Sequence, residues 1–200
     1  MKTCYIVGAS PFEDVLSIDE DDLVIAADGG QAALARMGIR PHLVVGDFDS
    51  SEAPSDVSVV RHPVEKDDTD TALAIKEGMR RGYEHFVLYG CTGGRFDHTL
   101  ANIQTLYRLA LEGLFGYLVF DDGTVGTVVA NKSLHFSPKG LVSVFSLTDE
   151  CEGVTIEGLK YPLTNARLTN DYPLGVSNEG TGAPSKISVR RGALLVLFKR

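Results

Sequence analysis

Two aspartates, Asp47 and Asp49, stand one residue apart just after an apolar run, in the stretch VVGDFDSS. If this run is a strand that continues through them, their side chains face the same side, about 6.5 Å apart along the chain. Two such charges repel by about 2 to 3 kcal/mol at an effective dielectric constant near 20, so a partner that offsets them is expected. One carboxylate that caps a turn and one that is solvated would explain an isolated pair. The functional alternative is Mg²⁺, which binds one or two carboxylates together with phosphate oxygens.

A second acidic cluster lies in KDDTDTALAIKEGM. Asp67 and Asp70 flank the predicted start of a helix, where carboxylates interact favourably with the helix dipole and Asp67 can act as the cap. Capping explains one of these carboxylates, but it does not explain why Lys66, Asp67, Asp68 and Asp70 occur together. Acidic residues mixed with one lysine are typical of a site for a metal ion and a polyphosphate.

Two glycine-rich stretches follow predicted strands. ADGGQAALA places Asp28 and Gly29 at a strand-to-helix turn, where glycine permits close backbone approach and the helix N-terminus attracts anions; a plain tight turn is the alternative. The stretch GCTGGRFDHT repeats this arrangement before another helix, with Thr92, Gly93, Gly94, Arg95, Asp97 and His98. An arginine suits phosphate oxygens better than a lysine does. His98 fits a helix start as well as it fits a catalytic role.

Over the first 120 residues, apolar strands alternate with amphipathic helices. The predicted strands are TCYIVGAS, DLVIAADGG, HLVVGDFDS and HFVLYGCTGG; the predicted helices are QAALARMG, TDTALAIKEGMRRG and HTLANIQTLYRLALEG, which end at Gly38, Gly82 and Gly113. This alternation predicts a parallel sheet covered on both faces. In such sheets ligands bind beyond the carboxyl ends of the strands, where the Asp and Gly clusters fall.

The pattern changes after about residue 125. SLHFSP, GLVSVFSL, GVTIEGL, NARLTND and GALLVLF are short β-type runs separated by turn residues, typical of a small sandwich or barrel. YLVFDDGTVG is interpreted as the last strand of the first domain and the crossing point. We therefore predict an α/β domain over residues 1–125 and a β-sandwich over residues 126–200.

Composition excludes several classes of protein. The chain has 200 residues, 44% hydrophobic and 23% charged, as in ordinary folded proteins. A net charge of −8 with 19 scattered basic residues argues against nucleic-acid binding. The N-terminus does not resemble a signal peptide and no run has the length of a membrane span, so a cytoplasmic protein is expected. The three cysteines lack CxxC spacing, which argues against a disulfide framework or a zinc site.

The motifs ADGG, GDFDS, KDDTD and GGRFDHTLAN, in this order and followed by a β-rich tail with SNEG, resemble thiamine pyrophosphokinase of the bacterial type. The resemblance spans nearly the whole chain. It implies a homodimer with a Rossmann-like α/β domain, a C-terminal β-sandwich and an active site in a cleft between subunits. The implied reaction transfers the pyrophosphoryl group of ATP to the hydroxyl of thiamine and releases AMP.

The resemblance also implies residue roles. Asp47, Asp49 and Asp70 would hold Mg²⁺, with Asp28 and Gly29 nearby. The nucleotide phosphates would contact Lys66, Thr69 and Arg95, beside the predicted binding residues Asp67, Thr92, Gly94 and His98. Asp97, Ser177 and Asn178 would place the thiamine. Either Asp97 or Asp70 would take the proton of the thiamine hydroxyl. Some family members use a tryptophan against the thiamine ring; this chain has none, and Tyr161 or Tyr172 is the alternative.

Two other classes of function compete with this interpretation. VVGDFDSS also resembles the strand-then-DxD start of haloacid-dehalogenase-type phosphatases, although that motif usually lies near the N-terminus and is not followed by a β-sandwich. The non-enzymatic alternative is a module that binds Mg-ATP without turnover, with the β domain as a surface for a partner.

Overall fold

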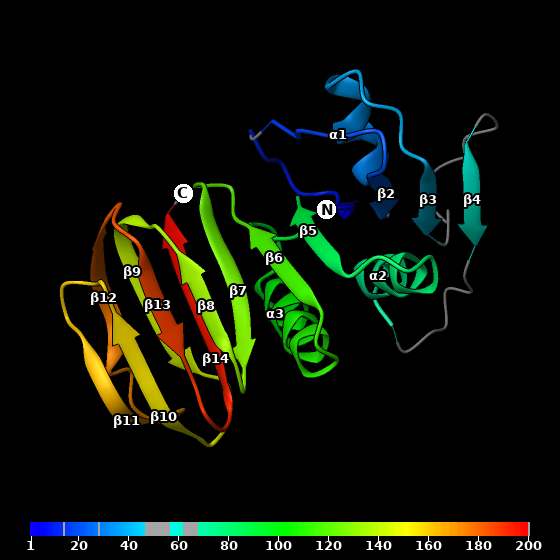
Figure 1. Cartoon of the computed structure of the whole chain (residues 1–200). Coiled ribbons are helices and arrows are strands. Elements are labelled where there is room, and N and C mark those ends of the chain that lie inside the picture. Colours follow the sequence, from blue (N-terminus) through cyan, green and yellow to red (C-terminus); the bar gives the residue numbers. More distant parts are fainter. Residues whose placement is uncertain (14, 28, 47–56, 62–67, 200) are drawn as a thin grey trace. The chain divides into compact units, whose positions relative to one another are not determined.

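A computed structural model of the chain describes residues 1–13, 15–27, 29–46, 57–61 and 68–199 (Figure 1). The fold is mixed α/β and divides into two compact units. The first unit comprises Met1–Asn102 and Leu118–Asp121, and the second comprises Ile103–Tyr117 and Asp122–Arg200. Helix α3 (Phe96–Leu111) and strand β6 (Phe115–Val119) each contribute residues to both units.

A parallel sheet forms the centre of the first unit. Its strand order is β5 (His85–Tyr89), β1 (Thr3–Val7), β2 (Leu23–Ala27), β3 (Leu43–Gly46) and β4 (Ser58–Arg61), and each neighbouring pair is parallel. The four strands predicted in this region are confirmed. Strand β4 was not predicted, because a four-residue run, SVVR, is too short to show a period.

Helices α1 (Gly30–Arg36) and α2 (Asp70–Arg80) pack on opposite faces of this sheet. Leu34 of α1 belongs to the apolar cluster that includes Val7 of β1. Gly78 of α2 approaches Cys4 of β1 so closely that an added Cβ would lie 2.8 Å from its Sγ. Cys4 and Val7 are an odd number of residues apart and point to opposite faces of the strand. The sheet is therefore covered on both sides, as the unbroken apolar runs predict.

The ends of the helices follow the turn chemistry of the sequence. Gly38, Gly82 and Gly113, the predicted stops, have φ of 69°, 78° and 82°, a conformation that glycine adopts without strain. The prediction that Asp67 caps α2 is wrong. The cap is Thr69, whose hydroxyl accepts a hydrogen bond from the Ala72 amide at 3.2 Å, because the backbone becomes helical only at Asp70.

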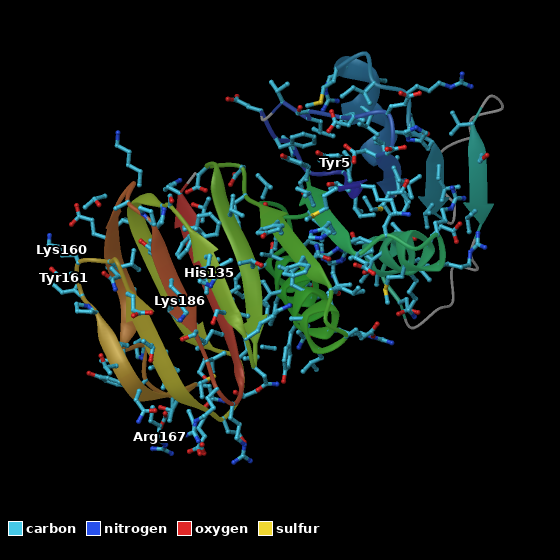
Figure 2. All side chains as sticks on the ribbon, viewed as in Figure 1. Tyr5, His135, Lys160, Tyr161, Arg167 and Lys186 are labelled. Atoms are coloured by element: carbon cyan, nitrogen blue, oxygen red, sulfur yellow. The ribbon has the colours of Figure 1, made fainter. Side chains whose placement is uncertain are left out.

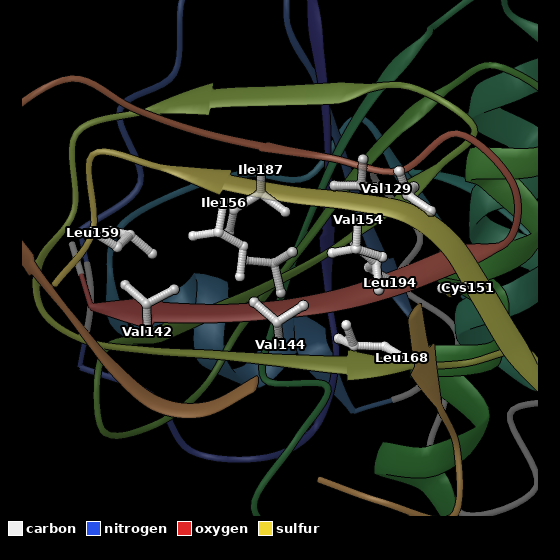
Figure 3. Packing of buried hydrophobic residues seen from close by; sticks show 12 residues of the cluster. Val129, Val142, Val144, Cys151, Val154, Ile156, Leu159, Leu168, Ile187 and Leu194 are labelled. Carbon is white, nitrogen blue, oxygen red and sulfur yellow. The ribbon is translucent and has the colours of Figure 1, made fainter. Parts of the chain in front are cut away.

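The second unit is a sandwich of two antiparallel sheets. One has the strand order β12 (Gly175–Thr181), β9 (Lys139–Ser146), β14 (Ala193–Lys199) and β7 (Thr124–Ala130); the other has the order β11 (Leu163–Thr169), β10 (Glu150–Glu157), β13 (Ser185–Ser188) and β8 (Ser133–Phe136). Their inner faces share one core, in which Val144 and Leu194 of the first sheet pack with Ile156 and Ile187 of the second (Figure 3). Sheets that meet face to face make a sandwich and not a barrel.

YLVFDDGTVG comprises the end of β6, a turn at Gly123 and the start of β7, and the division between the two units falls between Asp121 and Asp122. In the turn the Asp122 carboxylate accepts a hydrogen bond from the Thr124 amide at 2.9 Å. β13 was missed, and the SNEG stretch lies within β12 although its composition is typical of turns. Within the described part of the chain, no helix is both long and apolar enough to cross a membrane.

Candidate active site

A pocket of about 390 Å³ lies in the first unit, at the carboxyl ends of β1, β2 and β5. This volume is within the range of small-molecule sites. The position is the one that the parallel sheet predicts. Six of the predicted site residues line the pocket: Thr69, Asp70, Thr92, Gly94, Arg95 and His98.

Two glycines bring the turns that follow β1 and β5 into backbone contact. A Cβ on Gly8 would lie 2.5 Å from the Gly90 carbonyl oxygen, and Gly90 itself has φ of 61°. The Ser10 amide donates a hydrogen bond to the same Gly90 carbonyl at 3.0 Å. Ser10 therefore lies against the Gly94 loop and lines the pocket. This segment was not predicted from the sequence to be part of the site. A signal was present in the sequence, because a glycine, Gly8, follows an apolar strand.

One wall of the pocket is acidic. Asp70 is the first residue of α2, and Asp68 precedes the cap and pairs with Lys76 at 2.6 Å. Carboxylate oxygens are the ligands that Mg²⁺ prefers, so this wall fits part of a magnesium site. The other predicted residues of the site, Asp28, Asp47, Asp49, Lys66 and Asp67, lie outside the described residues. Among the described residues alone, no group of three His, Cys, Asp or Glu side chains is placed to hold a metal.

Arg95 and Asp97 form an ion pair at the start of α3. The Arg95 guanidinium donates to the Asp97 carboxylate at 3.1 Å and 2.5 Å. The hydrogen bond from Arg95 is the main reason that the pKa of Asp97 lies below its usual value. Arg95 lines the pocket, whereas Asp97 is exposed and not part of its wall. A phosphate that binds Arg95 must therefore share the guanidinium with Asp97 or displace it.

Cys91 lines the same pocket but has the properties of a structural thiol. Burial raises its pKa to about 12, and its Sγ lies 3.3 Å from the Tyr89 carbonyl oxygen. A thiol with this pKa is protonated at neutral pH, and the thiolate is the nucleophile. The pocket therefore contains no activated cysteine among its described residues.

Asn178 binds the backbone of Tyr161 in the second unit. Its Oδ1 accepts a hydrogen bond from the Tyr161 amide at 2.9 Å, and its Nδ2 donates to the Tyr161 carbonyl oxygen at 2.7 Å. Lys160 is the neighbour of Tyr161 in the loop between β10 and β11 (Figure 2). Its Nζ donates a hydrogen bond to the Glu179 carboxylate at 2.7 Å. This end of β12 thus holds Tyr161 by several contacts.

Ser177 and Asn178 lie at an irregularity of β12. The register with β9 shifts between Gly175 and Asn178, and Ser177 has φ of 59°. This backbone conformation is uncommon for residues other than glycine, and such strain is concentrated at functional sites. Asn178 is buried, and Ser177 is exposed. The two predicted residues therefore face different surroundings.

Comparison with known proteins identifies related sequences and structures. Residues 16–114 match the family model described as "Thiamin pyrophosphokinase, catalytic domain", and residues 131–194 match "Thiamin pyrophosphokinase, vitamin B1 binding domain". The thiamine pyrophosphokinase of Bacillus subtilis is 29% identical over 98% of both chains, and its crystal structure has a TM-score of 0.89. The crystal structure of thiamin pyrophosphokinase from Geobacillus thermodenitrificans is 28% identical, covers 99% of this chain and 97% of its own, and has a TM-score of 0.86. Thiamin pyrophosphokinase 1 of Caenorhabditis elegans is 26% identical over 70% of this chain and 63% of its own.

Proposed function

The chain belongs to the thiamine pyrophosphokinase family, and we propose that it uses Mg²⁺ to transfer the pyrophosphoryl group of ATP to the hydroxyl of thiamine. The single observation that carries this proposal is the match of one chain to both the catalytic and the vitamin B1 binding models of one family. The acidic wall and Arg95 of the pocket support it. The family does not favour the phosphatase or the non-catalytic binding module.

We propose that different parts of the chain bind the two substrates. Residues 1–125 would form a Rossmann-like domain that binds ATP and the metal, a proposal that the parallel sheet of the first unit supports. Residues 126–200 would bind thiamine, which the match of the vitamin B1 binding model to residues 131–194 supports.

The chemistry needs positioning and charge neutralisation more than a covalent nucleophile. Asp70, together with Asp47 and Asp49, would hold Mg²⁺, which neutralises phosphate charge when bound. Arg95, Lys66 and Thr69 would bind the phosphates. The thiamine hydroxyl oxygen forms a bond to the β-phosphorus, the bond from that phosphorus to the oxygen that bridges it to the α-phosphorus breaks, and AMP leaves with that oxygen. Either Asp97 or Asp70 would accept the hydroxyl proton.

Tyr161 is the proposed aromatic partner of the thiamine ring. It is 58% exposed, and its backbone is held by Asn178, a residue predicted to place thiamine. The alternative is Tyr172. None of the hydrogen bonds that Asn178 makes with the described residues involves Tyr172. An aromatic ring held at a fixed position offers a flat surface to a cationic heterocycle.

A homodimer with its active site at the subunit interface is also proposed. Leu141 of β9 is 61% exposed, on the face of the strand opposite the buried Val142. Leu174 and Val176, at the neighbouring β12, are 49% and 42% exposed. Exposed apolar side chains on neighbouring strands are typical of surfaces that bind another protein, and a second copy of the chain is the proposed partner. We further propose that the protein functions in the cytoplasm, where ATP is available.

Nucleotide chromatography tests the reaction. The purified protein is incubated with ATP, Mg²⁺ and thiamine, and with mixtures that lack each one. AMP that appears only with thiamine, together with a pyrophosphorylated thiamine, is the expected result. ADP or free phosphate regardless of thiamine would refute the proposal.

The proposed metal ligand Asp70 has its own test. Asp70→Asn should abolish turnover while the fold is kept, because the amide removes the charge that the metal requires. Mg²⁺ titrations of ATP binding should show a weaker dependence on the metal than in the wild type. Asp19→Asn, at an exposed residue outside the pocket lining, is the matched control. A fully active Asp70→Asn protein would refute the metal assignment.

A further inference from the structure

Three neutral polar side chains in the pocket are nearly buried. Thr92 follows β5, and Thr99 and Asn102 lie one helical turn apart on α3. Their exposed fractions are 4%, 9% and 5%, and all three line the pocket. We refer to these three residues as the polar floor. Polar side chains with so little exposure are normally hydrogen-bonded.

The orientation of the Asn102 amide is determined by its contact with the backbone. Its nitrogen donates a hydrogen bond to the Cys91 carbonyl oxygen at 2.7 Å, and only the nitrogen of the amide can donate to a carbonyl. The Asn102 Oδ1 accepts no hydrogen bond from any described residue. Since no fully buried side-chain oxygen in the described part of the chain lacks a partner, this oxygen borders the open space of the pocket.

The same reasoning applies to the two threonines. No side-chain hydrogen bond of the described residues involves the Thr92 or the Thr99 hydroxyl, and since no fully buried side-chain oxygen there lacks a partner, both hydroxyls border open space. The polar floor therefore offers one obligate acceptor and two hydroxyls that can donate or accept. A ligand that satisfies them removes the cost of leaving such groups unpaired.

The Asn102 oxygen of the polar floor does not suit phosphate, although the two hydroxyls can donate to it. An ionised phosphate presents only acceptor oxygens, and these would face the Asn102 oxygen, another acceptor. A nucleoside presents ribose hydroxyls and a base amino group, which donate hydrogen bonds. The carboxylates of the pocket belong to another segment, because Asp68 and Asp70 lie at the start of α2. Arg95 lies between Thr92 and Thr99 in the sequence and places a positive charge beside the polar floor.

The location of the polar floor favours ATP over thiamine. All three residues lie within residues 16–114, which match the catalytic family model, whereas the vitamin B1 binding model matches residues 131–194. We propose that Thr92, Thr99 and Asn102 bind the nucleoside part of ATP by hydrogen bonds and so separate nucleoside recognition from phosphate binding within one pocket. This inference rests on the proposed function, because it takes ATP as the ligand of the pocket.

Binding of Mg-ATP and of Mg-tripolyphosphate, measured by calorimetry without thiamine, tests the inference. Thr99→Val removes the hydroxyl with little change of shape, and Thr92→Val does so independently. Each variant should bind Mg-ATP about fivefold more weakly, as expected for one lost hydrogen bond, and should bind Mg-tripolyphosphate as the wild type does. Thr105→Val is the matched control, because Thr105 lies on the same helix but not in the pocket lining.

Unchanged affinity for Mg-ATP in both variants would overturn the inference, as would an equal loss for ATP and tripolyphosphate. In turnover assays, a raised KM for thiamine with an unchanged KM for ATP would overturn it in favour of a thiamine site. The binding measurements need no turnover. If the protein binds Mg-ATP through these hydroxyls but forms no AMP, the proposed reaction fails while nucleoside binding stands.

Discussion

Thr69 combines a structural role with a proposed contact to the phosphates of ATP, and a short series of substitutions separates them. Its hydroxyl caps α2 through the Ala72 amide at 3.2 Å, and the next residue, Asp70, lines the pocket. Thr69→Ala removes this cap, which costs about 1 kcal/mol. For a chain of this size the melting temperature should fall by about 2 to 4 °C.

Thr69→Asp distinguishes the cap from the phosphate contact. A carboxylate is a good N-cap and interacts favourably with the helix dipole, so this variant should melt at or above the wild-type temperature. If the phosphates of ATP bind beside Thr69, the new charge repels them. At about 5 Å and an effective dielectric constant near 20, the repulsion is about 3 kcal/mol, which weakens Mg-ATP binding roughly 100-fold.

The assay pairs thermal melting with calorimetric titration of Mg-ATP. Gln104→Glu, which adds one negative charge at an exposed position of α3 outside the pocket lining, controls for net charge. A Thr69→Asp protein that binds Mg-ATP like the wild type would refute the phosphate contact. An unchanged melting temperature in Thr69→Ala would refute the cap.

The remaining predictions concern thiamine, acid stability and packing. Tyr161→Ala should raise the KM for thiamine about tenfold, as expected for loss of about 1.4 kcal/mol of ring contact, while Tyr172→Ala should not; the opposite ranking in steady-state kinetics would favour Tyr172. Hydrogen bonds, of which the one from Arg80 has the largest effect, hold the pKa of Glu77 at about 2. The ionised Glu77 side chain therefore stabilises the folded protein fully above about pH 4.5, and this contribution is lost as the pH falls toward 2. Glu77→Gln should therefore melt slightly lower than the wild type at pH 7 and at the same temperature near pH 2, and a difference independent of pH would contradict this explanation. Gly30→Ala places a Cβ 1.9 Å from the Val7 carbonyl oxygen and should cost about 3 kcal/mol, whereas Gln31→Ala should cost little in the same denaturant titration.

The sequence contained most of the information about the first unit. Unbroken apolar runs between amphipathic segments predicted the strands and helices, and Gly38, Gly82 and Gly113 marked the helix ends that the structure confirms. These signals are local, because a strand between two helical layers needs apolar residues on both faces and a helix needs a residue that tolerates positive φ at its end. The motifs that contain Asp70 and Arg95 likewise predicted residues that line one pocket.

Other features depended on contacts between residues far apart in the chain. Ser, Asn and Gly favour turns locally, yet backbone pairing with β9 makes β12 a strand. The side chain of Asn178 is held in place by the backbone of Tyr161, which lies seventeen residues away in the sequence. No local pattern reveals that the oxygen and the nitrogen of its amide both bind the Tyr161 backbone.

The sequence by itself determined the class of fold, the C-terminal ends of the helices and the set of motifs, since each depends on the types of a few neighbouring residues. Only the tertiary structure decided that Ser10 joins the pocket and that the Asn102 oxygen faces it. Ser10 is held there because its amide binds the Gly90 carbonyl oxygen, and the Asn102 oxygen is left open because the amide nitrogen binds the Cys91 carbonyl oxygen. Both contacts are properties of the packed chain, because hydrogen bonds between distant segments are made only once folding brings them together.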